Sequence, residues 1–128
     1  MEKALKYELT KAIPELEGAI YPTNAPKNVK RPYLVYARIS TKTTKTLDGY
    51  TGDQALSYMY SVMAVRYEDM QALTQKVVDV LLSLPQKRIG RDGAMFVSDL
   101  EINNVDETWE NELNVNRGII DFTVYKEE

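Results

Sequence analysis

The chain has 128 residues, of which 44% are hydrophobic and 27% charged, and its net charge at pH 7 is −3. This length and composition suit one soluble globular domain with no overall charge to draw it to nucleic acid or anionic lipid. Cysteine and histidine are both absent, which excludes disulfides, thiolate metal sites and the commonest general base. We therefore expect no catalysis, no cofactor and no bound metal.

No stretch of the sequence predicts a signal peptide or a membrane span. The first six residues are of mixed charge, and the longest apolar candidate, Val77 to Leu84, is interrupted by Asp79 and Ser83. A membrane-spanning helix needs ~20 largely apolar residues. We expect the protein to be synthesised in the cytosol and to make no contact with a membrane.

The first third of the chain predicts a helix, a connector and a strand. Apolar residues at helical spacing predict a helix that ends near Ile13, because Pro14 has no amide hydrogen to donate. Residues 18–32 contain a glycine and three prolines and predict an ordered connector. A strand is expected from Tyr33 to Ile39. Residues 40–53, rich in threonine, lysine and glycine, predict a long mobile loop or the tip of a β-hairpin.

The remaining two thirds predict three more strands and a second helix. The strand near residues 55–65 has apolar residues on both faces, so it is either covered on both sides or offers one face to a partner. A helical stripe from Met70 to Leu84 is stopped by Pro85. A third strand has Phe96, Leu100 and Ile102 on its inner face, and the acidic residues 106–112 link it to a fourth. Leu113 and Val115 are out of phase with Ile120 and Phe122, which predicts a β-bulge near Gly118.

The resulting order of elements is α-β-β-α-β-β. Adjacent strands can pair as hairpins, and two amphipathic helices can cover one face of the sheet they form. We therefore expect one α+β domain over residues 1–128, with two layers and an antiparallel four-stranded sheet.

Several sequence runs resemble the tail completion family of long-tailed phages and prophages. Residues 20–22, 25–26 and 32–36 resemble the opening signature of the family, residues 62–69 its strand-to-helix junction, and residues 116–122 its last strand. Family members often carry glutamine or aspartate in the second strand, where this chain has Met59 and Ser61. The matches follow the family's order over nearly the whole chain.

The resemblance implies a structural role in virion assembly, without catalysis or a cofactor. Such proteins form a ring, usually of six copies, that terminates the tail tube at its head-proximal end and joins it to the head connector. The implied partners are other copies of the chain, the tail tube protein and the connector or stopper protein. The implied location is the head–tail junction of the virion. Because exposed ion pairs are weak, we expect the free subunit to be monomeric or weakly associated. Because the chain is acidic overall, we expect no sequence-specific binding of nucleic acid.

Charge is distributed unevenly along the chain. Residues 18–47 contain six basic residues and no acidic one, whereas residues 99–128 contain nine acidic and two basic residues. In a ring, the basic side of one copy is expected to meet the acidic side of the next, unless both are simply solvated surfaces. The candidate residues are Lys27, Lys30, Arg31, Arg38, Lys42 and Lys45 on the basic side, and Glu107, Trp109, Glu110 and Glu112 on the acidic side.

Apolar and aromatic residues give further candidates. Met59 and Met63 lie on one face of the second strand and are expected to supply apolar contact between copies. Trp109 either anchors an interface or folds back over its hairpin. The tyrosines of the first two strands either pack in a core or interface, or line a ligand cage; they are Tyr33, Tyr36, Tyr58 and Tyr60. The last possibility defines the rival function, a small ligand-binding or enzymatic α+β domain that uses its aromatic sheet face.

Overall fold

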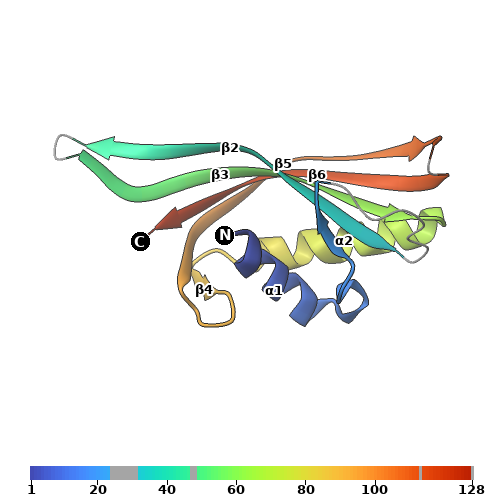
Figure 1. The fold of residues 1–128 in the computed structure, drawn as a ribbon, viewed down its shortest axis with the longest axis horizontal. Helices are drawn as coiled ribbons and strands as arrows, with labels where there is room; N and C mark the ends of the chain where they lie inside the picture. Colours follow the sequence, from blue (N-terminus) through green and yellow to red (C-terminus); the bar gives the residue numbers. More distant parts are fainter. Residues whose placement is uncertain (24–31, 47–48, 113, 128) are drawn as a thin grey trace.

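The computed structural model describes residues 1–23, 32–46, 49–112 and 114–127, with side chains left out at 44–46 and 49–52. Candidate residues Lys27, Lys30 and Arg31 lie outside the described residues. In chain order the elements are α1 (Glu2–Ala12), a 3₁₀ turn η1 (Pro14–Leu16), β1 (Ile20–Pro22), β2 (Tyr33–Thr46), β3 (Gly49–Ala64), α2 (Tyr67–Leu82), β4 (Lys87–Ile89), β5 (Met95–Glu110) and β6 (Val115–Glu127) (Figure 1).

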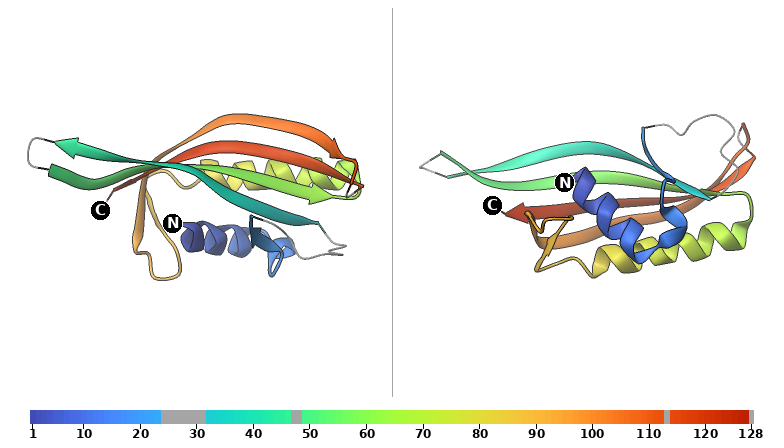
Figure 2. Two further views of the ribbon diagram at one scale, coloured as in Figure 1. Left: turned by 45° about the horizontal axis from the view of Figure 1, so that its top comes forward. Right: turned by 60° about the horizontal axis from the view of Figure 1, so that its bottom comes forward.

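The described strands form one six-stranded sheet in the order β1-β2-β3-β6-β5-β4. β1 runs parallel to β2, and every other neighbouring pair is antiparallel. The sheet is mixed and curled (Figure 2), so the expected four-stranded antiparallel sheet is wrong. The two missed strands, β1 and β4, are only three residues long, which is too short to leave a readable alternation of apolar and polar residues.

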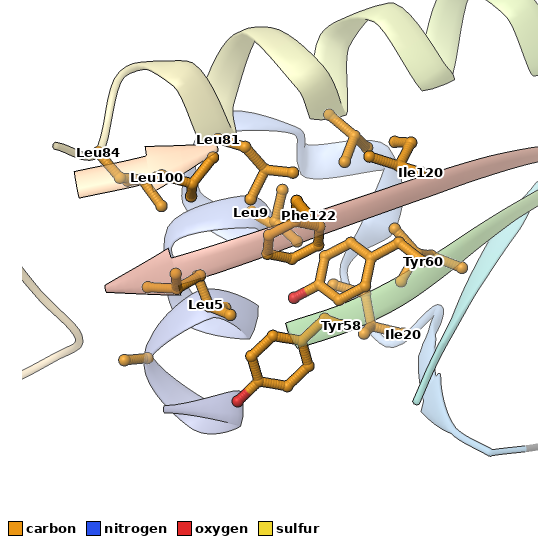
Figure 3. Packing of buried hydrophobic residues seen from close by; sticks show 14 of the residues in the cluster. Leu5, Leu9, Ile20, Tyr58, Tyr60, Leu81, Leu84, Leu100, Ile120 and Phe122 are labelled. Atoms are coloured by element: carbon orange, nitrogen blue, oxygen red, sulfur yellow. The ribbon is translucent and has the colours of Figure 1, made fainter. Parts of the chain in front are cut away.

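Both helices pack on the same face of this sheet (Figure 2). α1 buries Leu5 and Leu9, and α2 buries Leu73, Val77 and Leu81. These side chains meet the even-numbered residues of the central strands, as the close view in Figure 3 shows. The strand residues in this core are Leu56, Tyr58, Tyr60 and Val62 from β3 and Ile120, Phe122 and Val124 from β6. The opposite face of the sheet carries no helix among the described residues.

Gly118 has a packing role and is not part of a bulge. β3 and β6 stay in continuous register from Gln54↔Lys126 to Ala64↔Asn116, so the predicted bulge is wrong. A Cβ atom at Gly118 would lie 2.3 Å from Thr74 Oγ1 and 3.0 Å from Met70 Sδ. The glycine therefore lets α2 approach the sheet closely. Val115 is out of phase because it packs on the other face, in a small cluster with Ala19, Tyr33 and Met63.

Residues 40–46 and 49–53 form strand rather than a long loop. β2 continues to Thr46 and β3 starts at Gly49, with Thr46 opposite Gly49, so the hairpin alternative is correct up to these residues. β6 pairs with β3 only from Gln54 onward. The hairpin therefore extends beyond the body of the sheet as a two-stranded arm (Figure 1).

β5 is longer than predicted and is bent by two irregularities. It runs to Glu110, so most of the acidic stretch expected to be a link is strand. Its register with β6 shifts between Val97 and Asp99 and again between Ile102 and Asn104. The first shift explains why Val97 is fully buried, whereas the predicted core residue Phe96 is only half-buried. A single alternation of apolar and polar residues cannot predict the buried face of a strand whose register shifts twice.

Candidate interaction surfaces

The described basic candidates and most of the acidic ones lie on β2 and β5, on opposite sides of the two central strands. The outermost strands β1 and β4 are three residues long and flank β2 and β5 only in part, so we call the remaining sides of β2 and β5 the basic edge and the acidic edge. β2 carries Arg38, Lys42 and Lys45 and has no acidic residue. β5 carries Asp99, Glu101, Asp106, Glu107 and Glu110 and has no basic residue. β3 and β6 lie between them. A partner that covers one edge therefore does not cover the other.

The described part of the basic edge is polar and open to solvent. Lys42 is exposed, and Lys45 lies in β2 but its side chain is not described. The Arg38 guanidinium lies 3.5 Å from the Glu2 carboxylate, with half of the arginine side chain exposed. Ile39 lies at the register shift between Arg38 and Ser40 and is 60% exposed. This edge thus combines basic groups with an apolar side chain in water.

The acidic edge has the same combination with the opposite charge. Trp109 is 48% exposed and Val105 is 44% exposed, and Glu112 lies exposed in the turn after the strand. Glu107 accepts a hydrogen bond from the Tyr67 hydroxyl at the start of α2, which raises the pKa of Tyr67. Trp109 pairs with Asn116 at the end of the sheet and does not enter the core. About half of the Trp109 side chain is thus accessible to a partner, and its part in an interface stays a prediction.

The two methionine candidates differ in exposure. Met63 is only 8% exposed and belongs to the small cluster on the helix-free face. Met59 is half-buried on the same face, opposite Ala37 of β2 and Asp121 of β6. A partner could therefore reach Met59 more easily than Met63 without a rearrangement of the subunit.

An arginine network crosses the helix-free face and was missed in the sequence. Arg117 donates from Nε to Ser61 Oγ at 3.0 Å and from Nη1 to Glu110 Oε1 at 2.9 Å. It thereby ties β6 to β3 and β5, and engages one of the candidate acidic residues within the subunit. The sequence signal was the single basic residue between Asp106 and Asp121, but its partners lie seven and 56 positions away.

The tyrosines expected to line a possible ligand cage are mostly in the core. Tyr58 and Tyr60 are buried on the helix-covered face and contact Phe122, with ring centroids 5.6 and 4.7 Å away. Tyr36 packs against Tyr60, and Tyr33 lies on the other face against Tyr21. Burial raises the pKa of Tyr58 and of Tyr60. These side chains form packed ring contacts, and Tyr36 also lines the shallow depression beside α1.

A shallow depression lies where the start of α1 meets β1 and β2. Its lining includes Glu2, Lys3, Pro22, Tyr36 and Arg38, with the Glu2–Arg38 ion pair among them. It is wide open to solvent. No group of three or more potential metal ligands lies together in the described part of the chain. None of the described helices is long and apolar enough to cross a membrane.

The fold is shared with a chain of a virion particle of known structure. No family model matches the chain, and no curated protein matches its sequence. A chain from the virion of a native gene transfer agent (GTA) particle superposes with a TM-score of 0.73 at 13% identity. The superposition covers 100% of this chain and 95% of the other. At this identity the likeness establishes the fold.

Proposed function

We propose that the protein is a structural subunit of a phage-type virion, and that it acts as a ring which closes the head-proximal end of the tail tube. The ring would join the tube to the head connector without any catalytic step. The observation that carries the proposal is the likeness in fold, over the full chain, to a component of a gene transfer agent virion. The sequence runs that resemble the tail completion family point in the same direction.

Surface charge supports assembly into a ring. A closed ring requires two different, complementary surfaces on each subunit. The basic β2 edge and the acidic β5 edge meet this requirement, because they face away from each other across β3 and β6. Exposed ion pairs contribute only ~0–1 kcal/mol each. We therefore propose that apolar contacts supply most of the binding and that free subunits associate weakly.

The rival function, a ligand-binding or enzymatic domain built on the aromatic strands, has less support. Its expected lining residues Tyr36, Tyr58 and Tyr60 lie on the helix-covered face, and the latter two are buried in the core. The depression beside α1 contains an ion pair but is wide and shallow. The two oppositely charged edges are the more distinctive feature of the surface.

A complementation assay tests the proposed function. Particles made without the protein should yield separate heads and tails, and purified protein should restore their joining. Lys42→Glu should reduce joining, because it reverses charge on the basic edge, while the free energy of unfolding stays within about 0.5 kcal/mol of wild type. Lys6→Glu, an equal change on the exposed surface of α1, is the matched control.

Reversal on the acidic side completes the assay. Glu112→Lys should partly restore joining to the Lys42→Glu protein, since Glu112 is exposed beside the acidic edge. Normal joining in particles that lack the protein would rule out the proposed function. Equal loss from Lys42→Glu and Lys6→Glu would show that the position of the charge does not matter.

A further inference from the structure

Two stretches of strand edge have no neighbouring strand among the described residues. β1 covers β2 only as far as Tyr36, where Thr23 donates its amide hydrogen to the Tyr36 carbonyl. β4 pairs with β5 as far as Val97, and the Gln86 side chain donates a hydrogen bond to the Ser98 carbonyl. Ser40–Thr43 in β2 and Asn104–Glu110 in β5 then run without a register shift. Outward backbone groups on these stretches can accept another strand.

Charge decides which strand each edge can accept. Rows of charged side chains commonly protect a free edge from pairing with other chains. Here each edge has one sign of charge, basic on β2 and acidic on β5. Like charges directly opposite each other destabilise a strand pair, and opposite charges stabilise it. Pairing of β2 with β2, or of β5 with β5, is therefore disfavoured, while pairing of β2 with β5 is favoured.

Exposed apolar side chains lie on the same two edges. β2 presents Ile39, and β5 presents Val105 and Trp109, each at least 44% exposed. Burying these side chains against a neighbouring copy removes apolar surface from water, which surface ion pairs alone do not do. Tryptophan is among the residues that most often dominate binding at an interface.

Strand direction fits a head-to-tail repeat. β2 is antiparallel to β3, β3 to β6, and β6 to β5, so β2 and β5 run in opposite directions. When a second copy is placed beside the first without turning the sheet over, each strand keeps its direction. The β2 edge of the second copy then lies antiparallel to the β5 edge of the first.

We infer that the sheet continues from one copy of this chain to the next, through antiparallel pairing of the β2 edge with the β5 edge. This inference rests on the proposed ring, because it names the contact that would close it. The charges disfavour symmetric pairing of two identical edges, which would end assembly at a dimer. They allow the head-to-tail contact from which a ring can form.

Paired cysteines test the contact, since the natural chain contains no cysteine. One copy carries Ser40→Cys or Lys42→Cys, and a second, differently tagged copy carries Asn104→Cys, Asp106→Cys or Thr108→Cys. All five positions are exposed and belong to the helix-free face. Mixed subunits are treated with a short bifunctional thiol reagent, both in assembled tails and at about 1 mM in solution, where weak complexes are populated.

Antiparallel pairing predicts a specific pattern of yields. A shift of two residues forward along β2 should move the best partner two residues backward along β5. If Ser40→Cys couples best to Thr108→Cys, then Lys42→Cys should couple best to Asp106→Cys. Thr41→Cys is the matched control, because Thr41 lies opposite Leu56 and so faces the helix side. It should couple at least fivefold less to the same β5 positions.

The outcomes separate this inference from the proposed function. Two outcomes overturn the edge pairing and leave the ring proposal standing. The first is that the best partners shift in the same direction along both strands. The second is that no mixed product forms, either in rings seen by electron microscopy or at about 1 mM subunit. The expected pattern in a protein that does not restore head–tail joining supports the edge pairing but overturns the proposed function. Cross-linking of two Lys42→Cys subunits to each other, at a yield equal to that of the mixed pair, would overturn the pairing of β2 with β5.

Discussion

At the scale of single residues, the buried tyrosines of β3 connect packing with pH. The Tyr58 hydroxyl is buried, and no hydrogen-bond partner satisfies it among the described residues. Burial, followed by the nearby Glu2 carboxylate, raises the pKa of Tyr58. Burial also raises the pKa of Tyr60 well above its usual value of 10. Both phenols therefore stay protonated in the folded protein after they have ionised in the unfolded chain.

This difference predicts a loss of stability in alkali. Above pH 10 the unfolded chain releases protons that the folded protein keeps, so the free energy of unfolding falls as pH rises. Each such tyrosine contributes a slope of up to about 1.4 kcal/mol per pH unit. Tyr58→Phe should make the decline shallower by up to that amount, and should not destabilise the protein at pH 7, because it removes an unsatisfied buried hydroxyl.

Thermal unfolding followed by circular dichroism from pH 8 to pH 11.5 checks this prediction. Tyr7→Phe is the matched control, because it makes the same change at a side chain that is 37% exposed. A parallel decline in wild type and Tyr58→Phe would show that Tyr58 ionises equally easily in both states. The sequence indicated that the tyrosines pack, but it could not show that a hydroxyl is left without a partner.

At the scale of elements, the helices were predictable because one periodic apolar face decides each of them. α1 ends at Ala12 before Pro14, and α2 ends at Leu82 before Pro85, each within two residues of the predicted end. The hairpin was harder, because Ser40–Thr43 are all exposed and show no alternation of apolar and polar side chains. The phase of β5 was also lost, since its register shifts depend on contacts with β6 that lie far along the chain.

The contact between α2 and β6 depends on Gly118. Gly118→Ala should lower the free energy of unfolding by about 1–3 kcal/mol, because the new Cβ would overlap Thr74 Oγ1. Thr74→Ala removes that oxygen and should recover part of the loss, so the double variant should be more stable than the sum of the single changes predicts. Chemical denaturation measures all three variants. Strict additivity would show that the overlap is relieved elsewhere.

At the scale of the whole molecule, the sequence predicted the two charge regions but not their geometry. The position of the acidic residues on the part of β5 that β4 does not flank required knowledge that β5 extends to Glu110 and that β6 separates it from β3. The three basic residues that precede Tyr33 lie outside the described residues, so their place in the contact stays a prediction. The six-stranded order followed from pairings between distant segments, which a local pattern does not encode.

The hairpin arm is expected to contribute to contacts with partners and little to the stability of the subunit. In the part of β3 that precedes Gln54, β2 is the one described strand that pairs with it. A two-stranded ribbon by itself is at best marginally stable. The arm should therefore contribute little to the stability of the subunit. Its extension beyond the body in Figure 1 leaves it accessible to a partner.

Replacing residues 44–53 with Asn-Gly tests this division. Thr43 and Gln54 are opposite each other, so a two-residue turn can connect them without disturbing the rest of the sheet. The free energy of unfolding should change by less than about 1 kcal/mol, while joining of heads to tails should fall at least tenfold. A control that replaces only residues 47–48 with Asn-Gly keeps the paired strands and should join normally. A large loss of stability in the shortened chain would make the arm part of the fold, and normal joining would exclude it as a contact.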